Sequence, residues 1–396
     1  MSVEGTLALL TAGLAGLGIA EHAFYIRKRK RIPLRLHVAG TRGKSSVTRL
    51  LAAGLKDAGI PTVAKTTGTM ARMIFPDGRE FPVFRPSGPN LIEQKRIIST
   101  AADLGAKAVV IECMALQPIL HWVSENQIIR ATHGVITNVR ADHLDVMGPS
   151  EDDVARALAG MIPVKGKLFT AERKRLPILA EACRDRGTEL IALGEDEIAA
   201  ISYEQLTGFS YFEHAENVAL ALKVLSTLGI DRNKALRSMQ KAVPDPGALS
   251  LHRLHFYGRE LMFVNAFAAN DPESTERIWR EARERNGDYS RVVAVFNLRA
   301  DRPLRTAQLA KQTAFWREAA QVVLMGDGAM LFGRMAASVG ADVSRFIYAQ
   351  GTVEEAFEHI VEASQSGTLI IGMGNTGGSG MDLVRLFRNR ADTESP

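Results

Sequence analysis

Cysteine is scarce in this chain: its 396 residues include only Cys113 and Cys183. Two isolated cysteines exclude a disulfide framework and a four-cysteine zinc site, and they are typical of a reducing compartment. Aromatic residues make up only 6%, without the aromatic–basic interleaving of single-strand nucleic-acid binders. The 46% hydrophobic content nevertheless suits a folded protein, and the length predicts about two or three domains.

Net positive charge is also small outside the N-terminus. Four of the five net positive charges lie in residues 1–35, where six basic residues outweigh Glu4 and Glu21, so the rest of the chain carries a net charge of only +1. A nucleic-acid motor would carry a basic stripe on its folded body. The sequence therefore predicts no nucleic-acid partner.

A long apolar run opens the sequence. Residues 6–20 are all apolar or small, residues 24–26 extend the run, and Arg27–Arg31 follow at once. About twenty such residues span a bilayer as a helix, and the basic flank places the body in the cytoplasm. The first five residues contain no Lys or Arg, unlike a cleavable signal peptide. We predict a single-pass membrane helix with its basic flank at residues 1–31, the alternative being an interfacial or buried helix.

The rest of the sequence alternates between strand-like and helical segments, which predicts an α/β fold with mostly parallel sheets. The expected strands are residues 34–39, 107–112, 134–139, 261–265, 292–297, 322–325 and 368–372, and the expected helices include 45–58, 216–228, 272–285 and 353–364. The breaker cluster Pro244–Gly247 predicts a boundary between domains at 32–245 and 246–396.

The sharpest motif is His-Val-Ala-Gly-Thr-Arg-Gly-Lys-Ser-Ser at residues 37–46, between an expected strand and helix. Glycines let successive backbone N–H groups surround a phosphate at a helix N-terminus. Lys44 would reach the β- and γ-phosphates, and the Ser45 hydroxyl would bind magnesium. Val38 replaces the first glycine of the full fingerprint, but the strand–loop–helix context favours nucleotide binding over a plain turn.

Two further candidates follow the next strands. Glu112 ends one apolar run, and His143 comes shortly after another. Ligands of open parallel sheets bind beyond the carboxyl ends of the strands, so Ser45, Glu112 and His143 are expected to converge. Hydroxyl, carboxylate and imidazole groups suit magnesium or manganese beside phosphates. Taken singly, Glu112 also fits a salt bridge and His143 a helix cap.

These motifs resemble the Mur-ligase superfamily, which includes peptidoglycan ligases and folylpolyglutamate synthase. The resemblance rests on G-T-R-G-K-S-S at 40–46, the strand-end Glu112 and T-N-V-R-A-D-H-L-D at 137–145, and more loosely on segments 213–217, 265–272 and 297–302. The expected fold is a P-loop Mur-ligase-like central domain followed by a smaller Rossmann-like domain. The membrane helix and a phosphate loop that starts at residue 37 resemble the ligase subunit family of poly-γ-glutamate synthase, which serves capsule biosynthesis.

The resemblance implies an ATP-dependent amide ligase that polymerises glutamate through an acyl phosphate and releases ADP. It implies catalytic roles for Lys44, His143 and Arg302, with Asp301 fixing Arg302, and metal binding by Ser45, Glu112 and His143. The nucleotide-binding residues would be Gly40, Thr41, Arg42, Gly43, Lys44, Ser45, Ser46, Asn138 and Asn217, with Asn138 steadying the loop and Asn217 near the adenine. Expected partners are ATP with Mg²⁺ or Mn²⁺, the growing polymer, small membrane-protein subunits and further copies of this chain.

Some positions depart from the superfamily. Ala157 and Leu158 stand where a carbamylated lysine is common, so we expect none, and Asn265 stands where the ribose contact is usually aspartate. The loop at residues 372–380 matches G-x-G-x-x-G, but no acidic residue follows at the spacing that a dinucleotide site requires. It is expected to be a glycine-rich turn or a substrate or partner loop.

Two alternatives remain open at this point. One is a folylpolyglutamate- or peptidoglycan-type ligase, against which stand the membrane helix and the lack of room for a first substrate domain. The other is a membrane-tethered ATP-binding scaffold, which would not need a second set of metal ligands. Nucleotide release with and without glutamate separates all three.

Overall fold

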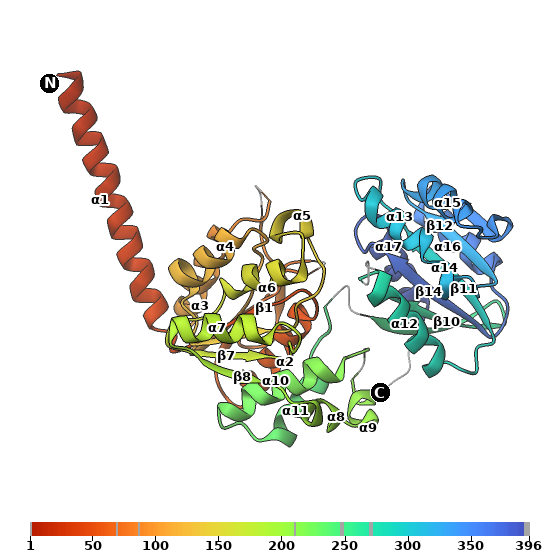
Figure 1. Ribbon diagram of the computed structural model, residues 1–396, viewed down its shortest axis with the longest axis horizontal. Helices are drawn as coiled ribbons and strands as arrows, with labels where there is room; N and C mark the ends of the chain where they lie inside the picture. Colours follow the sequence, from red (N-terminus) through yellow and green to blue (C-terminus); the bar gives the residue numbers. More distant parts are fainter. Residues whose placement is uncertain are drawn as a thin grey trace. The chain divides into compact units, whose positions relative to one another are not determined.

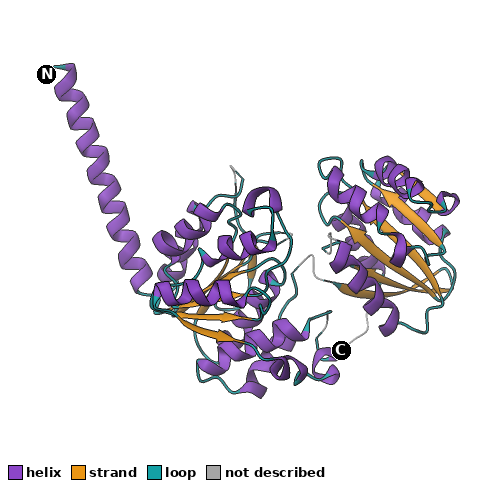
Figure 2. Cartoon of the chain, in the orientation of Figure 1, coloured by secondary structure: helices purple, strands orange, loops and turns teal. Residues whose placement is uncertain are grey.

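The computed structural model describes residues 2–68, 70–85, 88–209, 211–245, 249–268 and 272–391. The chain divides into two compact α/β units (Figure 1; Figure 2). The first unit runs to Phe209 and resumes at residues 213–243, and the second contains Tyr211, Phe212 and the chain from Pro244 onward. Pro246 and Gly247 of the expected hinge lie outside the described residues.

The first unit is built on an eight-stranded sheet in the order β4-β3-β2-β5-β1-β6-β7-β8. Its strands are β1 (Leu34–Ala39), β2 (Thr62–Lys65), β3 (Arg72–Ile74), β4 (Glu80–Pro82), β5 (Ala108–Glu112), β6 (His133–Ile136), β7 (Lys167–Thr170) and β8 (Glu189–Ala192). Its helices after the N-terminal one are α2 (Lys44–Asp57), α3 (Ile92–Asp103), α4 (Pro118–Val123), the π-helix η1 (Ser124–Ile129), α5 (Leu144–Met147), α6 (Glu151–Ala159), α7 (Leu176–Arg186), α8 (Glu195–Ala199), α9 (Tyr203–Thr207), α10 (Ala215–Thr227) and α11 (Arg232–Gln240).

The centre of this sheet is parallel and largely apolar, because helices cover both faces of it. Strand β5 is buried at every position, and its neighbour β1 pairs with it in parallel register. Only the β2–β3 and β3–β4 pairs are antiparallel. The predicted strand at 34–39 is confirmed, whereas β6 ends at Ile136 rather than at residue 139. The chain leaves the sheet there because the next residues bond to the loop after β1.

The second unit is a six-stranded sheet in the order β13-β12-β11-β14-β10-β9, parallel except for the β9–β10 pair. Its strands are β9 (Ser250–Phe256), β10 (Arg259–Asn265), β11 (Arg291–Asn297), β12 (Gln321–Met325), β13 (Phe346–Ala349) and β14 (Thr368–Gly374). Its helices are α12 (Pro272–Arg285), α13 (Pro303–Lys311), α14 (Thr313–Trp316), α15 (Ala329–Ser338), the 3-10 helix η2 (Val343–Arg345), α16 (Val353–Glu362) and α17 (Ser379–Arg390). Separate hydrophobic clusters, centred on residues such as Trp316 and Phe387, cover its two faces. The α/β prediction holds for both units.

Helix α1 (Val3–Lys30) is long and apolar enough to cross a membrane, with a mean hydropathy of 1.6 over its most apolar window and none of that window buried (Figure 1, red). The last turns of α1 pack against the first unit. Tyr25 is only 6% exposed, and its hydroxyl donates to the Ile128 carbonyl at 2.7 Å. Arg29 Nη1 donates to the same carbonyl at 2.8 Å. The predicted extension of the exposed span through residues 24–26 was therefore wrong at Tyr25, which packs into the first unit's core.

Candidate active site

The loop between β1 and α2 needs glycine at two positions. Gly40 and Gly43 have φ of +125° and +79°, a region that residues with a Cβ rarely adopt. A Cβ on Gly40 would overlap the Thr137 hydroxyl, and one on Gly43 would lie 2.5 Å from Oδ1 of Asn217. Both the positive φ angles and the close packing against Thr137 and Asn217 therefore favour glycine at these two positions.

Lys44 and Ser45 begin α2 and point to different neighbours. Lys44 Nζ donates to the Gly40 carbonyl at 2.8 Å and to the Thr41 carbonyl at 3.2 Å, so the ammonium lies over the loop. Ser45 Oγ donates to Glu112 Oε2 at 2.8 Å. The same carboxylate oxygen accepts the Thr67 backbone N–H at 2.6 Å, and Glu112 is only 2% exposed.

The residues after β6 hold the loop from the other side. Asn138 Oδ1 accepts hydrogen bonds from the Thr41 hydroxyl at 2.7 Å and from the Arg42 backbone N–H at 3.0 Å. The Thr137 hydroxyl donates to the Arg42 carbonyl at 2.6 Å. Residues 41–42 are thus braced through both their N–H and C=O groups.

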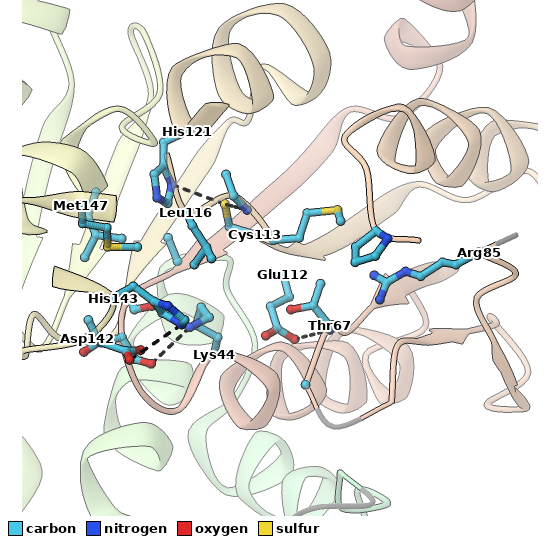
Figure 3. Close-up of a pocket in the computed structure, with 18 residues that line it drawn as sticks. Lys44, Thr67, Arg85, Glu112, Cys113, Leu116, His121, Asp142, His143 and Met147 are labelled. Carbon is cyan, nitrogen blue, oxygen red and sulfur yellow. Dashed lines mark hydrogen bonds and ion pairs between the residues drawn. The ribbon is translucent and has the colours of Figure 1, made fainter. Parts of the chain in front are cut away.

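A pocket of about 330 Å³ opens beside this loop (Figure 3). Its polar lining includes Lys44, Glu112, Asp142 and His143, and its apolar lining includes Leu116 and Met147. All the lining residues belong to the first unit: Ala39, Gly40, Thr41, Lys44, Thr67, Gly68, Arg85, Pro89, Glu112, Cys113, Met114, Ala115, Leu116, His121, Asp142, His143, Met147 and Leu158. Of the residues that were expected to converge, Glu112 and His143 line this pocket together with Lys44, and Ser45 joins them through its bond to Glu112.

His143 reaches the pocket from the residue before α5, where its backbone is left-handed with φ of +48°. Its Nε2 lies 3.8 Å from Asp142 Oδ1, and Arg42 Nη2 lies 3.9 Å from the same oxygen. Among the expected metal ligands, the Ser45 hydroxyl and the Glu112 carboxylate are in contact. Hard oxygen donors of this kind fit Mg²⁺ or Mn²⁺. The described part of the chain holds no group of three or more His, Cys, Asp and Glu placed for a metal ion.

Asn217 and Ser46 meet at Glu213. Asn217 Nδ2 donates to Glu213 Oε1 at 2.9 Å, and the Ser46 hydroxyl donates to the other carboxylate oxygen. Asn217 is only 5% exposed and packs against Gly43. Asn217, which was expected near the adenine, thus lies directly against the phosphate loop.

Several pocket residues escaped the sequence analysis, because they carry no motif. Cys113 Sγ lies 3.5 Å from His121 Nδ1. Burial raises the pKa of the Cys113 thiol to about 11 and lowers the pKa of His121 to about 4, so both groups are uncharged at neutral pH. Arg85 and Thr67 complete the opposite wall.

Arg302 belongs to the second unit, at the exposed position before α13. The expectation that Asp301 fixes it was wrong: Asp301 Oδ2 accepts from Arg299 Nη2 at 2.7 Å, and its other oxygen accepts from Arg299 Nε at 2.9 Å. The planar guanidinium of Arg299, two residues away, matches both carboxylate oxygens at once. Asn265 is buried at the end of β10, and Ala269, Asn270 and Asp271 lie outside the described residues.

The glycine-rich loop after β14 is closed by Asn297 of β11. Asn297 Nδ2 donates to the carbonyls of Asn375 at 2.5 Å and Gly377 at 2.9 Å, and Asn375 Nδ2 returns a bond to the Asn297 carbonyl at 3.1 Å. A Cβ on Gly380 would lie 2.7 Å from Asn297 Nδ2. These contacts give the loop glycines a packing role.

Two family models match the chain: the Mur ligase middle domain at residues 38–224, and the poly-gamma-glutamate synthase CapB C-terminal domain at residues 251–390. The capsule biosynthesis protein CapB of Bacillus anthracis is 40% identical over 323 residues, which cover 81% of this chain and 69% of that protein. PGA synthase CapB of Bacillus subtilis is 38% identical over 323 residues, with 81% of each chain covered.

Solved structures share the fold at low identity. Folylpolyglutamate synthase of Mycobacterium tuberculosis, solved with ADP and AMPPCP, matches with a TM-score of 0.68 and 17% identity over 94% of this chain and 95% of that one. The bifunctional folylpolyglutamate synthase/dihydrofolate synthase of Yersinia pestis, solved with AMPPNP and a Mn ion, has a TM-score of 0.64 and 18% identity over 92% of each chain.

The fold and the phosphate loop define a ligase of the Mur type, the class of ATP-dependent amide ligases. Within that class, the chain belongs to the CapB family of poly-γ-glutamate synthases.

Proposed function

We propose that this chain polymerises glutamate through γ-carboxylate amide bonds, with ATP converted to ADP and phosphate. The observation that carries the proposal is that Lys44, Glu112 and His143 line one pocket and that the Ser45 hydroxyl bonds to Glu112. The 38–40% identity to two CapB proteins supports the same proposal. The folylpolyglutamate synthases are 15–18% identical, which shows a common fold and gives no reason to assign a folate substrate.

The reaction proceeds in two displacements. A γ-carboxylate oxygen of a glutamyl substrate bonds to the γ-phosphorus of ATP while the bond from that phosphorus to ADP breaks, which gives an acyl phosphate. The amine of the next glutamate then bonds to the acyl carbon, phosphate leaves, and the amine releases a proton. The first step brings two anions together, so positive charge at the phosphates lowers its barrier. Lys44 supplies that charge once its Nζ leaves the loop carbonyls for the phosphates.

Ser45, Glu112 and His143 are proposed to hold Mg²⁺ or Mn²⁺. The bound ion supplies further neutralisation of the phosphate charges. The loop N–H groups bind the phosphates, and Thr137 and Asn138 keep those N–H groups in place through their bonds to residues 41–42. Arg302 is proposed to act from the second unit on the phosphates or the growing chain, and domain closure would exclude water from the acyl phosphate.

Helix α1 is proposed to anchor the chain in the cell membrane, with the two α/β units on the cytoplasmic side. Its exposed apolar surface and the basic residues at its end support this orientation. Small membrane-protein subunits that carry the polymer outward and self-association into a homo-oligomer remain predictions of the same kind.

The decisive experiment is nucleotide release by the purified full chain with MgATP, with and without glutamate. We expect ADP and phosphate that depend on glutamate, with no AMP. Production of AMP and pyrophosphate would mean adenylation and would overturn the acyl-phosphate route. ADP release only with a folate or a peptidoglycan precursor would favour the other ligase type, and ATP binding without glutamate-dependent turnover would favour a scaffold.

A further inference from the structure

One wall of the pocket carries a positive charge that the nucleotide site does not use. Arg85 lines the pocket together with Thr67 and Glu112. In Figure 3 its guanidinium points into the pocket from the side of Glu112 that is remote from Lys44 and His143. Arg85 precedes α3 in the chain and belongs to none of the motifs that predicted the nucleotide site.

Arg85 is held in place along one edge of its guanidinium. Its Nε and Nη2 each donate to the Glu93 carboxylate at 2.7 Å, and its side chain is 20% exposed. Nη1 makes no hydrogen bond or ion pair to the residues that the structure describes. A guanidinium has donors along two edges, so the edge with Nη1 remains available to a ligand in the pocket.

Glu93 is shared with a second cation. Lys65 Nζ lies 2.6 Å from Glu93 Oε1, and the Lys65 side chain is fully buried. Burial opposes ionisation of Glu93, but the hydrogen bonds from Arg85 and the charge of Lys65 outweigh it and keep the pKa of this carboxylate below its usual range. Glu93 therefore faces two basic side chains. Burial lowers the pKa of Lys65, and Arg85 is the one of the two that lines the pocket.

We propose that Arg85 binds the α-carboxylate of the glutamyl residue whose γ-carboxylate is activated. This inference rests on the proposed function. The γ-carboxylate must lie near the γ-phosphate, at Lys44 and the Ser45–Glu112 pair, and the α-carboxylate of the same residue is only a few bonds away. A carboxylate that enters a pocket needs a charged hydrogen-bond partner, and Arg85 offers one across the pocket from Lys44.

The arrangement also predicts specificity. A substrate that lacks the α-carboxylate would leave the free edge of Arg85 desolvated without a partner, and sites built to pair a polar group reject analogues without it. Lysine at this position would keep the charge but could not pair with Glu93 and a ligand along two edges of one plane. Arg85 thus selects for a glutamyl residue.

The test measures binding of two dipeptides to the full chain in detergent, in the presence of AMPPNP and Mg²⁺. γ-Glutamylglutamate carries the terminal α-carboxylate, and γ-glutamyl-4-aminobutyrate lacks it. We expect the wild type to prefer the first by roughly ten- to hundredfold, the range for a hydrogen bond to a charged group. We expect Arg85→Gln to abolish that preference while its affinity for AMPPNP stays unchanged.

A matched control is Arg79→Gln, because Arg79 is 73% exposed in the turn between β3 and β4 and pairs only with Asp77 among the residues described. It is expected to keep the wild-type preference. If Arg85→Gln does not fold, Arg85→Lys replaces it and is expected to lose most of the preference. Circular dichroism and thermal unfolding establish which variants fold.

The remaining outcomes separate the two proposals. Equal binding of both dipeptides by the wild type, or a preference that survives in the Arg85 variants, overturns this inference and leaves the proposed function intact. Loss of AMPPNP binding with the peptide preference retained also overturns it, since Arg85 would then serve the nucleotide. A wild-type chain that binds neither dipeptide and shows no glutamate-dependent ADP release overturns the proposed function itself.

Discussion

The Ser45 hydroxyl donates a 2.8 Å hydrogen bond to the Glu112 carboxylate, across 67 residues of sequence. The contact follows from strand pairing: β1 and β5 are parallel neighbours, and Val38 of β1 lies opposite Glu112 of β5. The phosphate loop begins where β1 ends, so its serine reaches the carboxylate that ends the adjacent strand. This short bond joins the nucleotide loop to the expected metal ligand.

Replacing Glu112 with glutamine should reduce glutamate-dependent ADP release by about 10²- to 10³-fold, a loss of the size seen when one group that stabilises transition-state charge is removed. The amide keeps the size of the side chain but removes the negative charge that a metal ion needs. The measurement is turnover against magnesium concentration. Glu189→Gln, an exposed change in β8 that affects only a 3.3 Å pair with Lys167, should behave as wild type. An unchanged magnesium dependence in Glu112→Gln would remove this residue from the metal site.

Lys44→Ala and His143→Ala should each abolish turnover while the fold is retained. Among the described residues, the Lys44 ammonium bonds only to carbonyls of its own loop, and His143 is partly exposed at the pocket, so neither side chain supports the core. Turnover and circular dichroism test the two halves of this prediction. The control is Lys56→Ala, near the other end of α2. Its Nζ donates to the Asp77 carbonyl at 2.8 Å. Normal turnover in either site variant would contradict the proposed chemistry.

Gly43→Ala should weaken nucleotide binding far more than Gly59→Ala. Both glycines are left-handed, with φ of +79° and +83°, and this conformation costs a residue with a Cβ about 1–2 kcal/mol. Only at Gly43 does the added Cβ meet a neighbour, Asn217 Oδ1 at 2.5 Å, whereas Gly59 has nothing within 4 Å. Affinity for AMPPNP separates the two effects. Equal losses in both variants would mean that strain alone, and not the contact with Asn217, shapes the loop.

The first unit should lose stability as the pH falls below about 6.5, in part through His121. Burial lowers its pKa from 6.5 to about 4 in the folded protein, so the unfolded chain takes up the proton first and is favoured as acid is added. Between pH 6.5 and pH 5 this costs about 2 kcal/mol. His121→Gln should reduce the loss by that amount in urea unfolding, whereas the exposed His359→Gln should not. An unaltered pH dependence in His121→Gln would show that His121 is not the group responsible.

Deleting residues 2–20 should release the chain from membranes and leave both α/β units folded, because none of the α1 window that could cross a bilayer is buried. Tyr25 and Arg29 are kept in this deletion, since their bonds to η1 belong to the folded unit. Membrane flotation of the two forms is the measurement. A deletion variant that still floats with membranes would contradict the proposed anchor.

Local features of this protein were predictable from its sequence. The apolar run at 34–39 and the helical period that follows it are properties of neighbouring residues, so β1 and α2 lie where the pattern indicates. The short strands β3 and β4 were missed, since three residues each give too little periodicity to distinguish them from loop. The pairing of Asp301 was mispredicted because two arginines of equal charge flank it, and only geometry chooses between them.

By itself, the sequence determined the α/β class, the glycine-dependent phosphate loop and the apolar N-terminal helix, because each depends on residues close together in the chain. Only the tertiary structure decided that Arg85, on the wall of the pocket, pairs with Glu93, which also pairs with Lys65, and that Tyr25 closes the core rather than facing lipid. Such contacts join residues from separate elements, and their geometry is set by how strands and helices pack, which no local pattern records.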